Sequence, residues 1–95
     1  MTDKILVFGI EVTVEIIPSA FDHGKTAEDI LTALGNSIYD ETLETYPNKT
    51  VVVGFDTNAN AIEMIVNVIS DVEIVIFHAM DCRKVFRDKI LGIGE

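Results

Sequence analysis

Apolar residues recur at every second position through residues 4–17, and this period of two predicts one long β-strand. Residues 5–8 are apolar on both faces and are expected inside a sheet, whereas residues 11–15 carry polar side chains on one face. Gly9 stands between the two halves, where a bulge or bend is expected. Pro18 then ends the strand, because proline has no backbone N–H to donate.

The apolar spacing then changes to three and four residues, which predicts a helix over residues 27–45. Thr26 is expected to cap the N-terminus of this helix together with Asp29, three residues further on. Gly35 is a weak point inside the helix, and Pro47 ends it.

A second helix is predicted over residues 62–69, after a capping pair formed by Asn60 and Glu63. Apolar residues occupy most of its circumference, so it is expected to be buried by the sheet, by a neighbouring element or by a partner.

Residues 50–55 are apolar without alternation, which is typical of a short strand that is covered on both faces. Residues 72–79 repeat this pattern and predict another strand. Asp81 is expected to cap a final helix, which ends at Gly92 and Gly94.

The predicted order is β-α-β-α-β-α in one small α/β domain that spans residues 1–95. Alternating strands and helices favour a three-stranded, mostly parallel sheet covered by helices, with residues 50–55 as its central strand. The alternative is an α+β fold in which the long N-terminal strand runs antiparallel.

Charge narrows the classes of function. The chain has 16 acidic and 7 basic residues and a formal net charge of −9. Such a chain repels nucleic acid and anionic membranes, and it favours partners with a basic surface.

One cysteine makes neither an internal disulfide nor a structural zinc site, so no metal or cofactor is expected. Without a signal sequence or a membrane-length apolar run, a cytoplasmic location is expected, in a cell or in a virus-infected host cell.

Residues 19–26 read Ser-Ala-Phe-Asp-His-Gly-Lys-Thr, which matches the pattern G-x-x-x-x-G-K-[ST] except for Ser19 in place of the first glycine. The segment resembles the phosphate loop of P-loop nucleotide-binding proteins, and Asp56 resembles the strand aspartate that assists the metal. The resemblance implies that Lys25 reaches the outer phosphates and that Thr26 holds magnesium. An ordinary turn and N-cap before a helix is the alternative.

Polar residues follow two of the predicted strands. Parallel pairing would gather them at one edge of the sheet, where open α/β sheets bind ligands. This alternative ligand site consists of Asp56, Thr57, Asn58, His78, Asp81 and Cys82. If the site were enzymatic, Cys82 would be the nucleophile and His78 the base. A buried cysteine and a set of turn residues are the simpler interpretation.

The last 45 or so residues resemble STAS domains, the anti-sigma-factor-antagonist fold, in the order strand, apolar helix, strand, helix, with Gly92 at the end. The resemblance implies a similar fold for this part of the chain. STAS domains carry a phosphorylatable serine before the apolar helix. Here the corresponding segment reads Asp-Thr-Asn-Ala-Asn over residues 56–60, and the switch serine is missing.

Acidic and aromatic residues recur together and suggest a protein-binding face. This predicted face consists of Glu11, Glu15, Tyr39, Asp40, Glu41, Glu44 and Tyr46. The function expected from these features is that of a non-enzymatic regulatory module, an inhibitor or adaptor that docks on a basic surface of a larger protein. A homodimer, formed through residues 62–69 or 4–17, is a further expectation.

Overall fold

A computed structural model describes residues 1–7, 9–44 and 48–92. The chain forms a six-stranded sheet with the strand order β1-β2-β6-β5-β4-β3. The strands are β1 (Thr2–Val7), β2 (Ile10–Ile16), β3 (Ser37–Glu44), β4 (Lys49–Phe55), β5 (Ala61–Ser70) and β6 (Glu73–Asp81). The helices are the 3-10 helix η1 (Pro18–Phe21) and the α-helices α1 (Ala27–Gly35) and α2 (Lys84–Leu91).

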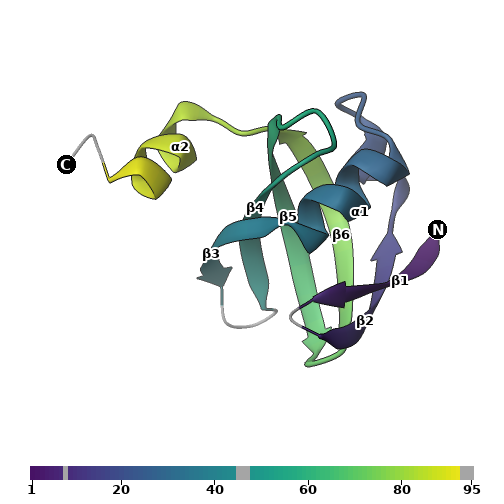
Figure 1. Ribbon diagram of the computed structural model, residues 1–95. Coiled ribbons are helices and arrows are strands. Elements are labelled where there is room, and N and C mark those ends of the chain that lie inside the picture. Colours follow the sequence, from purple (N-terminus) through teal and green to yellow (C-terminus); the bar gives the residue numbers. More distant parts are fainter. Residues whose placement is uncertain (8, 45–47, 93–95) are drawn as a thin grey trace.

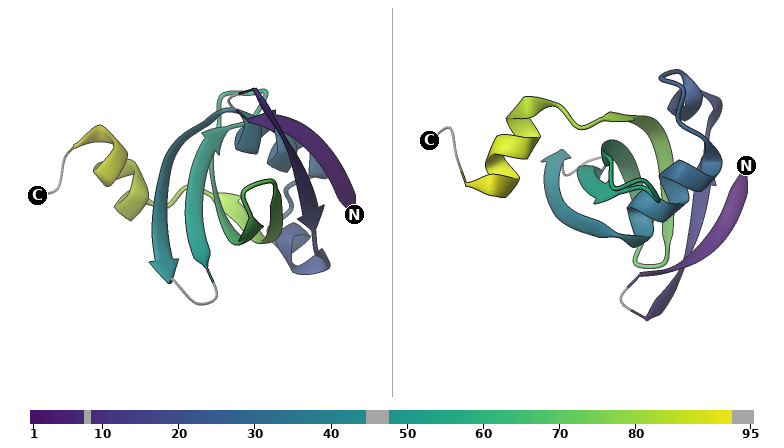
Figure 2. Two further views of the ribbon diagram at one scale, coloured as in Figure 1. Left: turned by 90° about the horizontal axis from the view of Figure 1, so that it is seen from below. Right: turned by 45° about the horizontal axis from the view of Figure 1, so that its top comes forward.

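The sheet is mixed, and only the pair β2 and β6 is parallel among the described strands. It is strongly curved, with β1 and β3 at its two edges (Figure 2). Helix α1 lies across one face, whereas α2 lies to one side, beyond the end of β6 (Figure 1). The prediction of a three-stranded, mostly parallel sheet covered by helices was therefore wrong.

Strand β5 accounts for most of this difference, because residues 62–69 were predicted to be a helix. The apolar side chains of this segment fit both the helical period of about 3.6 residues and the strand period of two. In the structure, Ile62, Met64 and Val66 occupy alternate positions that face the core. Its many β-branched residues favour the strand. The predicted capping pair is absent: Asn60 lies in the turn before β5, and Glu63 lies inside the strand.

Strand β3 is the second difference, since the predicted helix over residues 27–45 stops at its weak point. Helix α1 ends at Gly35, and Asn36 caps it. The next residues pair with β4 in an antiparallel register from Ser37↔Gly54 to Glu44↔Lys49. A nine-residue helix buries its apolar stripe on the sheet, and the following segment gains backbone partners from β4 along one of its two edges. Pro47 lies outside the described residues.

The N-terminal segment is a hairpin instead of one long strand. Gly9, with φ +78°, lies in the turn between β1 and β2, where a bulge or bend was predicted. Glu11 and Glu15 are exposed, Thr13 is half-buried, and Val12 and Val14 are buried, largely as the alternation predicted. Strand β1 lies at the edge of the sheet with Leu6 exposed, so the burial predicted for residues 5–8 was wrong for the described part; Phe8 lies outside it.

Strand β4 is buried on both faces, as its unbroken apolar run predicted. Val52 belongs to the main core under α1, whereas Val51 and Val53 pack with Phe86 of α2 in a second core. The strand is second from the edge, because β5 and β6 form the middle of the sheet, and its predicted central place was wrong.

The predicted helix ends are partly confirmed. Thr26 and Asp29 form a reciprocal capping box at the start of α1, and Gly92 ends α2 in the left-handed conformation with φ +73°. Asp81 belongs to β6 instead of capping α2, whose N-cap residue is Arg83. Gly94 lies outside the described residues.

Candidate functional site

The predicted ligand site at the strand ends is only partly assembled. Strands β4 and β6 point the same way, but β5 lies between them, so Asp56 and Asp81 share an edge of the sheet without being neighbours. Thr57 and Asn58 are exposed in the turn between β4 and β5. The buried Asp56 holds this turn together.

The carboxylate of Asp56 accepts three hydrogen bonds. Its Oδ1 atom accepts from the backbone N–H groups of Asn58 and Asn60, both at 2.9 Å, and its Oδ2 atom accepts from the Asn60 side chain at 3.2 Å. These bonds, chiefly the one from the Asn60 backbone, hold the pKa of Asp56 below its usual value. The residue therefore stabilises the turn between β4 and β5 through its own hydrogen bonds.

Replacing Asp56 with asparagine is expected to remove a pH-dependent part of the stability. The pKa of Asp56 is lowered in the folded state, so the ionised carboxylate stabilises the fold above its unfolded pKa of about 3.9. The stability difference between the wild type and Asp56→Asn should then shrink as the pH falls below that value. Urea unfolding at several pH values between 2 and 7 measures this difference, and a constant difference contradicts the assignment.

The other members of that predicted site are engaged within the protein. Cys82 is buried in the second core, and burial raises the pKa of its thiol, which makes it a poor nucleophile. Burial also lowers the pKa of His78, as does His23, whose ring centre lies 5.1 Å away. Asp81 forms an ion pair of 2.6 Å with Lys25.

The polar side chains of the segment that resembles a phosphate loop also bind other residues of the protein. The Lys25 ammonium binds Asp81, the Thr26 hydroxyl accepts the backbone N–H of Asp29, and the Ser19 hydroxyl donates to the carbonyl of Phe77. These groups stabilise the junction between η1, α1 and β6. The resemblance to STAS domains also fails in its topology, because β5 replaces the apolar helix.

The predicted acidic face is divided between two distant strands. Glu11 and Glu15 lie on β2, whereas Tyr39, Asp40, Glu41 and Glu44 lie on β3, at the opposite edge of the sheet (Figure 2). Tyr46 lies outside the described residues. Within the β3 group, Asp40 lines a cleft on the α1 side of the sheet, whereas Tyr39 and Glu41 lie on the α2 side.

Helix α2 is attached to the sheet by two ion pairs that the sequence patterns did not indicate. Glu63 of β5 is 0% exposed, and its carboxylate binds the guanidinium of Arg83, with an N–O distance of 2.9 Å. At the other end of the helix, Lys89 donates to Oε1 of Glu41 at 2.9 Å, and the Tyr39 hydroxyl donates to the same atom at 2.6 Å. The isolated glutamate within an apolar run was the one available signal for the first pair.

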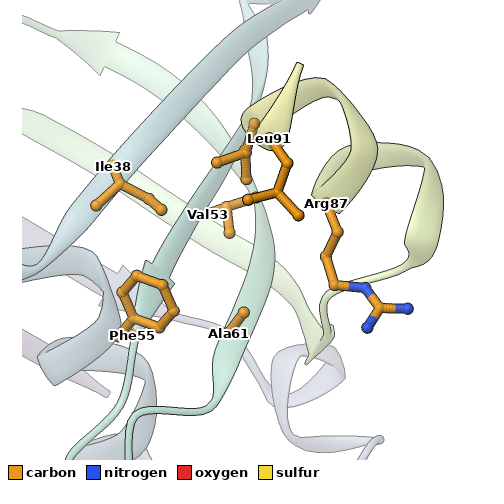
Figure 3. Close-up of a pocket in the computed structure, with 7 residues that line it drawn as sticks. Ile38, Val53, Phe55, Ala61, Arg87 and Leu91 are labelled. Atoms are coloured by element: carbon orange, nitrogen blue, oxygen red, sulfur yellow. The ribbon is translucent and has the colours of Figure 1, made fainter. Parts of the chain in front are cut away.

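An apolar cleft of about 200 Å³ lies between α2 and the strands β3, β4 and β5 (Figure 3). We call it the α2 cleft. Its lining residues are Ile38, Val53, Phe55, Ala61, Arg87, Ile90 and Leu91. Ile38 and Leu91 are 51% and 69% exposed, so large apolar side chains face solvent at its mouth. Sequence reasoning missed this cleft because its walls come from four separate elements.

A second cleft, of about 250 Å³, lies on the α1 side of the sheet. We call it the acid-rimmed cleft, because an apolar floor that includes Val12, Val52 and Val66 is bordered by Asp40 and Asp71. No basic side chain lines it within the part of the chain that the structure describes. The last turn of α1 contributes Leu34 and also contains no basic residue, so the negative end of the helix dipole adds to the charge of the rim.

Comparisons with known protein families, with curated proteins and with solved structures found no match. Among the described residues, no cluster of histidine, cysteine, aspartate and glutamate has an arrangement suited to a metal ion, and no helix is long and apolar enough to cross a membrane. The candidate site consists of β3 and the two clefts beside it.

Proposed function

We propose that this protein is a non-enzymatic binding module that accepts a basic segment of a larger protein as an additional strand along β3. The observation that carries the proposal is the position of β3. It is an acidic edge strand, and it contributes residues to both clefts: Ile38 to the α2 cleft, and Ser37 and Asp40 to the acid-rimmed cleft.

The backbone of β3 has an open side. Within the described sheet β3 pairs with β4 alone, so one row of its N–H and C=O groups has no strand partner. Such an edge accepts an extended segment of another protein, in which backbone hydrogen bonds supply affinity and alternate side chains supply specificity.

The charge of β3 selects the kind of segment. The strand contains Asp40, Glu41 and Glu44 and no basic residue. A second copy of β3 paired with the first would place like charges side by side, which is unfavourable, whereas lysine or arginine would be attracted. The net charge of −9 attracts the same partners at longer range.

The acid-rimmed cleft offers a place for one such side chain. Lysine and arginine have long aliphatic stems that bury well against apolar surface while their charged ends stay in a polar environment. A stem on Val52 and Val66 would leave its charge near Asp40 and Asp71. Neither acid forms an ion pair within the described residues, so both carboxylates can pair with an incoming cation.

Selection from a library of displayed random peptides tests the proposal. Peptides retained by the immobilised protein should be rich in lysine and arginine, and their affinity should fall as salt rises from 50 to 500 mM, because exposed charge pairs are screened. The double variant Asp40→Asn with Glu44→Gln should weaken binding by roughly five- to tenfold, as two exposed ion pairs at a binding surface would predict.

The matched control is Asp22→Asn with Glu28→Gln, which removes the same charge from exposed positions near the start of α1. If both double variants weaken binding equally, only the net charge matters and the β3 site is wrong. Selected peptides without a basic bias would also contradict the proposal. An inhibitor or adaptor of a larger basic protein would bind in this manner.

A further inference from the structure

Arg87 is unusual among the bases of this chain. Of the seven basic residues, the other six each form an ion pair within residues 1–7, 9–44 and 48–92, and Arg87 forms none there. In a chain with more than twice as many acids as bases, an arginine without an ion pair among the described residues needs an explanation. Its position suggests one, because Arg87 lies on the wall of the α2 cleft.

Among the described residues, the rest of this cleft is lined by apolar side chains. Figure 3 shows Ile38 on β3 and Leu91 on α2 on opposite sides of Val53, with Phe55 and Ala61 further along the cleft. The Arg87 side chain extends from α2 to one side of these residues (Figure 3), and Arg87 is exposed. Apolar lining with a single cation at one side matches a ligand that carries an apolar group next to a negative charge.

We propose that the α2 cleft binds the C-terminal residue of the segment that pairs with β3, with its apolar side chain in the cleft and its terminal carboxylate on the guanidinium of Arg87. This inference rests on the proposed function, and it adds that the segment is the end of a chain. The planar guanidinium fork binds a carboxylate through two parallel hydrogen bonds, which a lysine ammonium does not reproduce.

The direction of β3 supports this placement. The strand begins at Ser37, and Ile38 at the same end lines the cleft. A segment paired antiparallel with β3 would run from Glu44 toward Ser37 and would therefore end beside the cleft. Its preceding residues would lie next to Asp40 and Glu44, where the basic side chains are expected. One segment would thus satisfy the acidic strand and the single cation together.

Pairs of synthetic peptides test the inference. Each selected basic peptide is made with a C-terminal leucine, once with a free carboxylate and once as the amide. The wild-type protein should bind the free acid about tenfold more tightly, which is the effect of one charge-assisted bidentate contact. In Arg87→Gln this preference should disappear. Lys84→Gln is the matched control, because it removes the same charge from α2 at an exposed residue that does not line the cleft.

A second measurement does not depend on β3. Addition of N-acetylleucine should shift the side-chain Nε–Hε resonance of Arg87 in NMR spectra, whereas N-acetylleucinamide should leave it in place. Equal binding of acids and amides by the wild type, or a preference that persists in Arg87→Gln, overturns the inference and leaves strand addition at β3 intact. A shift of Arg87 with N-acetylleucine, combined with peptide binding that is insensitive to Asp40 and Glu44, would support the cleft and contradict the proposed function.

Discussion

Replacing Gly54 with alanine is expected to destabilise the protein by about 3 kcal/mol, at the upper end of the range for an overfilled core. Gly54 lies in β4 directly beneath α1. A Cβ atom at this position would lie 1.8 Å from the carbonyl oxygen and 2.7 Å from the carbonyl carbon of Ala33. These are backbone atoms of the helix, so no rotamer change relieves the overlap and α1 has to move. Urea unfolding followed by circular dichroism measures the loss.

Gly35 supplies the matched control for this substitution. It is the last residue of α1, its backbone does not require a positive φ, and an added Cβ would meet no atom within 4 Å. Gly35→Ala is therefore expected to stabilise the protein by up to about 0.5 kcal/mol, because alanine favours the helix and restricts the unfolded chain. If the two alanine variants have equal stability, the close packing of α1 on β4 is wrong.

Replacing Arg83 with alanine is expected to cost about 2 kcal/mol, because it leaves the buried carboxylate of Glu63 with fewer partners. The Arg83 side chain binds both carboxylate oxygens, with Nε at 3.0 and 3.1 Å, while its backbone N–H also donates to Oε1 at 2.8 Å. The expected cost is below that of a fully buried pair, since the Arg83 side chain is 54% exposed and its backbone hydrogen bond remains. Thermal unfolding and limited proteolysis of α2 measure the effect.

The double variant Glu63→Met with Arg83→Ala tests whether the buried Glu63 carboxylate causes the loss of stability in Arg83→Ala. It removes the buried charge together with its partner, so it should recover much of the stability lost in Arg83→Ala. Lys84→Ala breaks an exposed pair with Asp88 on the same helix and should cost less than about 0.5 kcal/mol. If Lys84→Ala and Arg83→Ala have the same effect, the anchoring role of the Glu63–Arg83 pair is wrong.

The attachment of α2 to the sheet also bears on the candidate binding surface, which lies between α2 and β3. Helix α2 contacts the sheet mainly through Phe86 and two ion pairs, one of which uses Glu41 of β3. The helix therefore leaves the cleft beside Ile38 open. Loss of the Arg83 contact should disturb that cleft, so binding measurements with Arg87 variants require an intact Glu63–Arg83 pair.

Local signals in the sequence were sufficient for several elements. The capping box of Thr26 and Asp29 fixed the start of α1, and Gly92 marked the end of α2. The unbroken apolar run of residues 50–55 correctly predicted a strand covered on both faces. Each of these features depends on neighbouring residues alone, through caps, backbone conformation or burial periodicity.

The choice between helix and strand for residues 37–44 and 61–70 was decided by tertiary structure. Both segments fit either period, and backbone pairing with β4 selects the strand in each case. Because residues 61–70 form a strand, Glu63 is not the helix cap that was predicted but part of a buried ion pair with Arg83. The strand order also separates Glu11 and Glu15 from the acids of β3.

The sequence by itself determined the excess of acids, the start of α1, the end of α2 and the burial of β4 on both faces. Only the tertiary structure decided that the chain builds a mixed sheet with β3 at its edge and a cleft on either side. The physical reason is that caps and short apolar runs act over a few residues, whereas an edge strand and a cleft exist only through contacts between segments that are distant in the chain.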